Sequence, residues 1–355
     1  MSLPLSSAFA GRSVFLTGHT GFKGSWLSVW LARLGARVHG YALPPCTTPS
    51  MFELAKVESL LKHHVLADVR DLAALTTAMQ EAAPEIVFHL AAQPLVRLSY
   101  RDPATTWSTN VMGTVNLLEA VRACPSVKAV VVVTTDKCYE NREWLWGYRE
   151  SDPLGGNDPY SASKAATELV VQSYRKSFFW NGGPLLASAR AGNVIGGGDW
   201  SEDRLIPDAA RAVAATRPLV IRNPDATRPW QHALESLHGY LLLATRLLAG
   251  EAALADAFNF GPDAADNIPV GELLKRLHAH WPELAWELDP QAAASPHEAR
   301  FLYLDSSKAR RLLNWSPVWN LAEGLDKTAQ WYRAVQKNPA AARAMTEQQL
   351  DEFCR

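Results

Sequence analysis

One short segment near the start of the chain limits the folds that this sequence can adopt. An apolar, β-branched run, Ser13–Thr17, leads into a turn that contains three glycines, and a helix-like stretch, Ser25–Leu34, follows it. The turn reads Gly18-His19-Thr20-Gly21-Phe22-Lys23-Gly24. Glycines permit a tight turn and let the backbone approach a diphosphate, whose charge then lies at a helix N-terminus. Because the turn joins a strand to a helix, we expect a dinucleotide to bind there.

Further strand-like runs alternate with helix-like runs through the first half of the chain. The predicted strands are Ala36–Tyr41, His64–Ala67, Ile86–Leu90 and Ala129–Thr134. The last of these is continuously apolar, which is typical of a strand that is buried on both faces. The pattern predicts an α/β protein with a Rossmann-type, doubly wound parallel sheet and helices on both of its faces.

The length of the chain, 355 residues, indicates two lobes, since single cores rarely exceed roughly 250–300 residues. The second half differs from the first because it carries glycine clusters, proline turns and long helical stretches. We predict a dinucleotide-binding domain over residues 11–188, with a returning segment near 230–262. We expect a second, smaller mixed α/β substrate domain over 189–229 and 263–345.

Two more segments lie where predicted strands end and a cofactor would cross the sheet. Asp68-Val69 follows the third strand, where a carboxylate can accept a hydrogen bond from an adenine amino group. Leu90-Ala91-Ala92-Gln93 ends the fourth strand with small residues. The second strand ends at His39–Ala42 without the carboxylate that often holds the ribose 2′-hydroxyl, so these residues do not choose between NAD and NADP.

Two groups of reactive side chains are expected at the same edge of the sheet. Tyr160 and Lys164 are four residues apart, so they share one face of a helix. An ammonium group and a positive nicotinamide ring would lower the pKa of the tyrosine from about 10, making it a base for a substrate hydroxyl. Thr135, Asp136 and Lys137 follow the fifth strand and face the same crevice. Simple hydride transfer does not need this additional acid and amine.

These patterns together give a set of predicted cofactor ligands. The set is Gly18, Thr20, Gly21, Phe22, Lys23, Gly24, Asp68, Val69, Leu90, Ala91, Ala92, Gln93, Tyr160 and Lys164.

Composition restricts the partners and the location of the protein. Lys plus Arg total 35 and Asp plus Glu total 36, a balance that does not favour nucleic-acid or membrane binding. The four cysteines are scattered without metal-ligand spacing, so we expect free thiols and no metal site. The first ten residues do not resemble a signal peptide, and no apolar run is long enough to span a bilayer. We therefore expect a cytoplasmic protein.

Several longer segments resemble CDP-glucose 4,6-dehydratases, in the nucleotide-sugar dehydratase branch of the extended short-chain dehydrogenase/reductase family. The most specific are Thr134–Glu150 and Arg190–Trp200, and the resemblance covers nearly the whole chain. The other segments that carry it are Thr17–Leu31, His89–Tyr100, Thr109–Thr114, Asp158–Lys164, Arg204–Asp208, Arg228–His232 and Tyr303–Trp315.

The resemblance implies a tightly held NAD and a reaction on CDP-glucose that yields CDP-4-keto-6-deoxyglucose. Tyr160 would remove the 4-hydroxyl proton, water would leave from C5 and C6, and hydride would return to C6. Related dTDP-glucose enzymes carry Asp-Glu where this chain has Asp136-Lys137. Asp136, if burial keeps it neutral, would protonate the departing C6 hydroxyl. Lys137 would be the C5 base if uncharged, or would stabilise the enolate if charged.

The resemblance also implies substrate contacts and an assembly. Asn193 and Arg204 would reach the base and ribose side of the nucleotide, Arg228 would clamp the pyrophosphate, and Arg97 lies in a family-like segment. Helices predicted over Pro103–Ala123 and Ser161–Phe179 pair across a two-fold axis in proteins of this type. We therefore expect a homodimer or a higher homo-oligomer.

Three alternatives remain at this point. A nucleotide-sugar 4-epimerase would share the glycines, Tyr160 and Lys164, but does not need the Asp136-Lys137 pair for an elimination. A dehydratase that acts on another NDP-hexose also remains, because the choice of nucleotide base depends on the shape of the pocket. A non-catalytic NAD-sensing regulator on this fold commonly lacks the tyrosine or the lysine, and both are present here.

Overall fold

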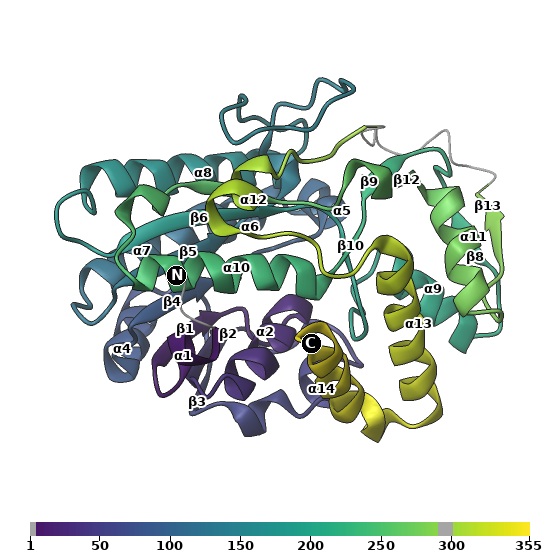
Figure 1. The fold of residues 1–355 in the computed structure, drawn as a ribbon, viewed down its shortest axis with the longest axis horizontal. Helices are drawn as coiled ribbons and strands as arrows, with labels where there is room; N and C mark the ends of the chain where they lie inside the picture. The colour runs from purple at the N-terminus through teal and green to yellow at the C-terminus, as the bar shows by residue number, and fades with distance from the viewer. Residues whose placement is uncertain (1–4, 290–300) are drawn as a thin grey trace.

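The computed structural model describes residues 5–289 and 301–355, whose central element is a seven-stranded parallel sheet (Figure 1). The strand order is β11-β6-β5-β4-β1-β2-β3, and every neighbouring pair is parallel. The strands are β1 Ser13–Thr17, β2 Arg37–Ala42, β3 His63–Leu66, β4 Ile86–His89, β5 Ala129–Val133, β6 Leu185–Ala191 and β11 Ala257–Phe260. The predicted Rossmann-type, doubly wound α/β fold is confirmed.

Successive side chains of a strand point to opposite faces of the sheet, so they enter two separate hydrophobic cores. In β1, Val14 and Leu16 enter the core that contains α2 and α10, while Phe15 enters the core that contains α4, α7 and α8. In β5, Val131 and Val132 divide in the same way. Because both faces of the sheet are covered by helices, its strands read as continuous apolar runs.

The helices follow the predicted pattern, with shifts at their ends. They are α1 Leu5–Phe9, α2 Phe22–Arg33, α3 Met51–Leu54, α4 Leu72–Ala82, α5 Val96–Arg101, α6 Pro103–Trp107, α7 Gly113–Arg122, α8 Pro159–Ser177, α9 Leu205–Ala214, α10 Ala233–Leu248, α11 Val270–His280, α12 Ser307–Leu313, α13 Leu321–Lys337 and α14 Ala342–Phe353. The single helix predicted over 103–123 is interrupted by a π-helical turn, η2 Ser108–Met112.

The start of α8 explains one of these shifts. The Asp158 side chain accepts a hydrogen bond from the backbone N–H of Ser161 at 2.9 Å, and Pro159 occupies the first helical position. An aspartate cap followed by proline is a strong helix start, so α8 begins two residues before the predicted Ser161. Tyr160 therefore lies in the first turn of the helix.

The second lobe carries three short two-stranded sheets, together with α9, α11 and α13, beside the end of the main sheet (Figure 1). These sheets pair β7 Val194–Ile195 with β10 Gln231–His232, β9 Thr227–Pro229 with β12 Asn267–Pro269, and β8 Leu219–Ile221 with β13 Trp286–Leu288. The segment near 230–262 contains α10 and β11, and β11 pairs with β6 in the main sheet. Because the predicted boundary at 188/189 falls inside β6, we propose that the first domain extends to Ala191.

Within residues 5–289 and 301–355, no helix has both the length and the apolar character needed to cross a membrane.

Candidate active site

A cavity of about 1110 Å³ lies at the carboxyl ends of β1, β3, β4, β5 and β6. It continues into the second lobe. The chain order reverses between β1 and β4, which is where doubly wound sheets bind their ligands. Every predicted site residue except Asp136 lines this cavity. Asp136 is the first residue of η3, Asp136–Cys138, between Thr135 and Lys137, which both line it.

The glycine turn forms a cradle that only glycine permits. A Cβ atom on Gly24 would lie 2.1 Å from the Gly18 carbonyl oxygen, and one on Gly18 would lie 2.7 Å from the backbone nitrogen of Ala91. Gly18 also has φ +76°, a conformation that other residues rarely adopt. The backbone is therefore open to a ligand at the N-terminus of α2, and these residues fit the diphosphate of a dinucleotide.

Several of the predicted cofactor ligands have protein partners of their own, and Asp68 and Lys23 are two of them. Asp68 accepts from the Arg70 guanidinium at 2.6 Å, and this hydrogen bond lowers the pKa of its carboxyl group. Lys23 donates from Nζ to the Tyr240 hydroxyl at 2.7 Å. Burial lowers the pKa of Lys23 to about 7, and the positive charges of Arg204 and Lys164 act in the same direction.

Tyr160 and Lys164 lie on α8 with both side chains buried beside the cavity. Burial lowers the pKa of Lys164 to about 8, and the negative charge of Glu168 partly offsets this. Lys164 Nζ donates to the carbonyl oxygen of Val133, the last residue of β5, at 3.2 Å. This contact ties the lysine to the strand that carries Thr135 and Asp136.

The predicted lowering of the tyrosine pKa is wrong for the protein chain alone. Burial raises the pKa of Tyr160 to about 12, because a phenolate loses more hydration energy than the nearby groups return. The hydrogen bond with Thr135 and the positive charge of Arg204 act in the opposite direction. Thr135 and Arg204 therefore favour the phenolate but do not overcome the effect of burial.

Thr135, Asp136 and Lys137 form one connected group at the end of β5. Thr135 Oγ1 donates to Asp136 Oδ1 at 2.9 Å, and Lys137 Nζ lies 3.5 Å from the same oxygen. The other carboxylate oxygen, Asp136 Oδ2, is buried and has no hydrogen-bond partner among the described residues. Lys137 Nζ also donates to Asn193 Oδ1 at 3.3 Å. Asn193, predicted to contact the nucleotide, thus also contacts the amine of the acid–base pair.

The three predicted arginines line the cavity, and each of them has a hydrogen-bond partner. Arg204 donates to Asp199 Oδ2 at 3.0 Å, and Arg97 of α5 donates to Asp203 Oδ1 at 3.2 Å. Arg228 donates from Nη1 to the Thr227 carbonyl oxygen at 2.8 Å. Arg204 is also close enough to Tyr160 to favour its phenolate, so it lies nearer to the reacting groups than the sequence suggests.

Comparison with known proteins agrees with this site. The family model described as GDP-mannose 4,6 dehydratase matches residues 15–328. The CDP-glucose 4,6-dehydratase of Salmonella typhimurium is 51% identical over 330 residues, which is 91% of each chain. This chain belongs to the GDP-mannose 4,6 dehydratase family. The predicted assignment to the nucleotide-sugar dehydratases, and to hydro-lyase enzymes, is confirmed.

Two solved structures resemble this chain, one in its fold and one also as a dehydratase of nucleotide sugars. Epimerase Mth375 from Methanothermobacter thermautotrophicus superposes with a TM-score of 0.81 at 23% identity, covering 94% of this chain and 96% of that one. DesIV, a dTDP-glucose 4,6-dehydratase from Streptomyces venezuelae solved with NAD, gives a TM-score of 0.73 at 27% identity, covering 91% and 98%. The first likeness shows the fold alone.

Sequence reasoning missed three buried polar residues beneath this dehydratase site. Asn110, in the π-helical turn, accepts from the Gln93 backbone N–H at 2.8 Å and donates to Ser163 Oγ at 2.8 Å. Glu168 and Arg190 form a buried ion pair. The spacing of Glu168, four residues after Lys164, was a usable signal, but nothing local indicates that η2 would turn Asn110 inward.

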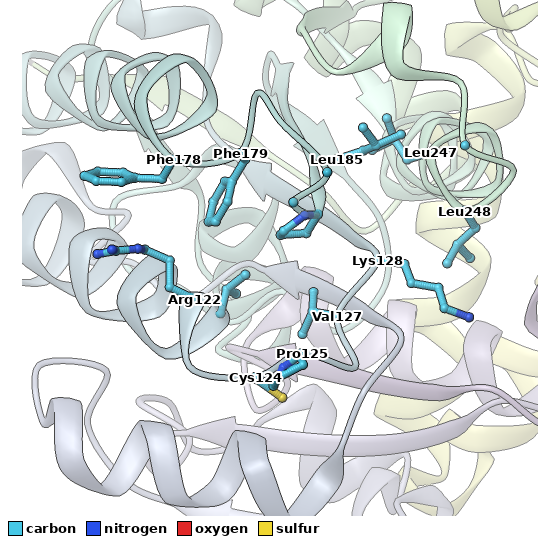
Figure 2. Close-up of a pocket in the computed structure, with 15 residues that line it drawn as sticks. Arg122, Cys124, Pro125, Val127, Lys128, Phe178, Phe179, Leu185, Leu247 and Leu248 are labelled. Atoms are coloured by element: carbon cyan, nitrogen blue, oxygen red, sulfur yellow. The ribbon is translucent and has the colours of Figure 1, made fainter.

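A second cavity, of about 690 Å³, lies at the opposite ends of β5 and β6 (Figure 2). Its walls include Phe178, Phe179 and Leu248, and its two cations already have acidic partners. Arg122 donates to Glu119 at 2.8 Å, and Lys128 donates to Glu85 at 2.9 Å. None of the predicted site residues of the dehydratase lines it.

Proposed function

We propose that this chain converts CDP-glucose to CDP-4-keto-6-deoxyglucose with NAD as its cofactor. One observation carries the proposal: Lys137, Tyr160 and Lys164 line one cavity, with the Asp136 carboxylate 3.5 Å from Lys137 Nζ, in a chain that is 51% identical to a CDP-glucose 4,6-dehydratase. An acid and an amine at this position supply proton transfers that an elimination of water requires.

Binding of the cofactor is assigned to the glycine cradle and the ends of β3 and β4. The Gly18–Gly24 turn would take the diphosphate, Asp68 would accept from the adenine amino group, and Leu90–Gln93 would border the path across the sheet. NAD, when bound, would accept hydride from C4 of the sugar and later return it to C6. The assignment is supported by the steric closeness of Gly24 to Gly18, which leaves no room for a side chain there.

Each protein group has a separate task in this scheme. Tyr160 removes the proton from the 4-hydroxyl, with Thr135 and Arg204 favouring its phenolate. Asp136 donates a proton to the departing C6 hydroxyl. We assign this task to its buried Oδ2, which has no hydrogen-bond partner among the described residues. Lys137 removes the C5 proton, and a proton returns to C5 when the hydride has returned to C6. The contacts of Lys137 with Asp136 and Asn193 hold the amine in position for the removal.

The anionic nucleotide would be held by the second lobe. Arg228 is the residue that we expect to bind the pyrophosphate, because a guanidinium group can form bidentate hydrogen bonds with phosphate oxygens. Asn193, Arg204 and Arg97 complete the predicted substrate contacts. All four line the same cavity as the catalytic group.

A 4-epimerase is the second candidate, and an epimerase is among the solved structures that share the fold. An epimerase needs a tyrosine and a lysine, which this site has, but it has no task for Asp136 and Lys137. A dehydratase for another NDP-hexose would catalyse the same elimination, so the nucleotide pocket decides which base is bound.

The test is to incubate the protein with CDP-, dTDP-, UDP- and GDP-glucose. We expect a 4-keto sugar, detected by its absorbance in alkali, from CDP-glucose, with no added reductant and no net NADH. Preferential turnover of another nucleotide would overturn the choice of base. Stoichiometric NADH accumulation would rule out the internal redox cycle, and a C4-epimerised product without loss of water would favour the epimerase.

Two further expectations remain predictions. We propose a homodimer or larger homo-oligomer, on the basis of the helices α6 to α8. We also propose a cytoplasmic location, on the basis of the scattered cysteines.

A further inference from the structure

A buried ion pair that the proposed reaction does not use lies directly under the catalytic residues. Arg190 Nη2 donates to Glu168 Oε2 at 2.8 Å, and the two side chains are 4% and 2% exposed. Removing two charges from water is costly, and such a pair often contributes little net stability. The pair therefore needs another explanation.

The contacts of Glu168 connect three elements that carry the site. Its Oε2 also accepts from Ser188 Oγ of β6 at 2.7 Å, and its Oε1 accepts a short hydrogen bond from Thr134 Oγ1. Thr134 follows β5 and directly precedes Thr135 and Asp136. Glu168 itself belongs to α8. One carboxylate thus joins the helix of Tyr160 to the strand end of the acid–base pair.

Arg190 fixes this carboxylate from the far side. Its Nη1 donates to the Tyr139 hydroxyl at 2.7 Å, and Tyr139 in turn donates to Asn259 Oδ1 at 2.7 Å. The positive charge of Arg190 is the main cause that lowers the pKa of Glu168 against the effect of burial. Glu168 is therefore ionised although it is fully enclosed.

The charge of Glu168 acts on Lys164, one helical turn earlier on the same face of α8. Lys164 is 6% exposed, so its ammonium group has little water to stabilise it. Among the groups that raise the pKa of Lys164, Glu168 is the largest and Cys138 is the second. Burial raises the pKa of the Cys138 thiol, which leaves it uncharged.

The other titratable groups around Lys164 do not replace Glu168. Lys23 of α2 carries charge of the same sign, and burial lowers the pKa of His89 of β4 to about 3, so that its imidazole is neutral. Tyr160 is uncharged at neutral pH because burial raises its pKa. Among the groups that raise the pKa of Lys164, Glu168 is therefore the one that carries a negative charge.

We propose that Glu168 is a positioning residue that keeps Lys164 charged and fixes α8 against the end of β5, with Arg190 holding Glu168 in place. The inference rests on the proposed function only in that Lys164 takes part in catalysis. A buried lysine that lost its proton would have no positive charge with which to stabilise a phenolate at Tyr160.

The test is Glu168→Gln, which preserves the shape and the oxygen that accepts from Thr134 or Ser188 but removes the charge. Lysine labelled with ¹³C at the ε-carbon reports the titration of Lys164 by NMR, and Lys164→Met assigns its signal. We expect the midpoint to fall by about one pH unit, because a unit charge one helical turn away is worth that much in a buried site. The alkaline limb of the pH–rate profile should move to lower pH by the same amount.

Two further variants separate charge from structure. Glu168→Asp keeps the charge and should leave the Lys164 midpoint within a few tenths of a unit of wild type, even if the rate falls. Should Glu168→Gln fail to fold because Arg190 is left unpaired, Glu168→Gln with Arg190→Met removes both charges and should show the same lowered midpoint.

An unchanged midpoint in a folded Gln variant, or an equal shift in the Asp variant, would overturn the proposal. These results do not depend on the proposed function. That function fails if the wild-type protein turns over none of the four NDP-glucoses, and the NMR titration can be measured in either case.

Discussion

Asp136 is the residue whose surroundings most directly indicate a task. It is fully buried, one oxygen accepts from Thr135, and the other has no partner among the described residues. Replacing it with Asn preserves the size of the side chain and removes the acidic proton. We expect Asp136→Asn to lose dehydration by about 10²–10⁴-fold, the usual contribution of a general acid, while C4 oxidation continues.

Single-turnover measurements distinguish these steps. Asp136→Asn should still form NADH transiently from bound NAD, seen at 340 nm, whereas Tyr160→Phe should not. Full dehydratase activity in the Asn variant would show that the acid is another residue.

Lys137 poses a sharper question, because an amine can act as a base or as a fixed charge. Its Nζ contacts both Asp136 and Asn193. Lys137→Arg keeps the charge but cannot release a proton at ordinary pH. If Lys137 is the C5 base, the Arg variant should be nearly inactive and unable to exchange the C5 hydrogen with solvent deuterium, and Lys137→Glu should retain some activity.

Mass spectrometry of the recovered sugar measures that exchange. Wild-type exchange in the Arg variant would mean that Lys137 acts through its electric field and that the base lies elsewhere.

Lys23 gives a prediction about stability rather than rate. Burial lowers its pKa to about 7, whereas an unfolded lysine titrates near its ordinary value of 10.5. Between these values the unfolded chain holds a proton that the native chain lacks, so stability rises with pH. The rise is at most about 1.4 kcal/mol for each pH unit. Lys164, with a pKa of about 8, contributes in the same direction.

Urea unfolding at pH 7 and pH 9 tests this for the nucleotide-free protein. Lys23→Met should reduce the increase in unfolding free energy without abolishing it, because Lys164 remains. An increase equal to that of the wild type would show that Lys23 is charged in the native protein.

At the scale of elements, the sequence predicts best where the signal is local. The glycine turn, the continuous apolar strands and the Tyr160–Lys164 spacing each lie within a few residues, and the structure has each near its expected place. Strand β6 was missed because Leu185–Ala191 alternates small and polar residues, and its burial depends on β5 and β11.

The pKa values of the site were predictable only in part, because they too depend on residues that are distant in sequence. The spacing of Tyr160 and Lys164 suggests that the lysine lowers the pKa of the tyrosine. Burial raises the pKa of Tyr160. The extent of that burial depends on the packing of the whole site, which no local sequence pattern encodes. The contribution of Arg204 comes from a loop that is distant in sequence.

The turn before α2 yields a prediction at this scale. A methyl group on Gly24 would lie 2.1 Å from the Gly18 carbonyl oxygen, whereas one on Gly21 would lie 3.4 Å from the same atom. Gly24→Ala must therefore move the turn, at a cost of about 1–3 kcal/mol in the free energy of unfolding. Gly21→Ala is the matched control and should unfold near the wild-type temperature.

Calorimetry and NAD titration together measure the effect of Gly24→Ala. We expect weaker binding as well as a lower melting temperature. Wild-type affinity in the Ala variant would show that the diphosphate does not depend on this turn.

At the scale of the whole molecule, the two lobes are linked across the cavity as well as through the chain. Arg97 of α5 pairs with Asp203, which precedes α9 of the second lobe, and Arg222, after β8, lies 3.7 Å from the same carboxylate. The Tyr332 hydroxyl of α13 donates to the Asp199 carbonyl oxygen. Of these contacts, the Arg97–Asp203 ion pair joins the two lobes, whereas the contacts of Arg222 and Tyr332 lie within the second lobe.

The predicted dimer can be tested through the outer surface of the helices α6 to α8. Trp107, Met112 and Leu169 are 41%, 51% and 55% exposed there, and pairing of these helices would cover apolar surface of this kind. If these helices pair across a two-fold axis, Leu169→Glu places a charge in an apolar interface on both subunits. We expect this variant to be monomeric by light scattering at micromolar concentration, whereas the wild type has the mass of a dimer or a multiple of it.

Leu145→Glu, at a position 79% exposed in a different loop, is the matched control and should leave the assembly unchanged. A wild-type monomer, or a Leu169→Glu variant that keeps its assembly while Leu145→Glu loses it, would contradict the predicted interface.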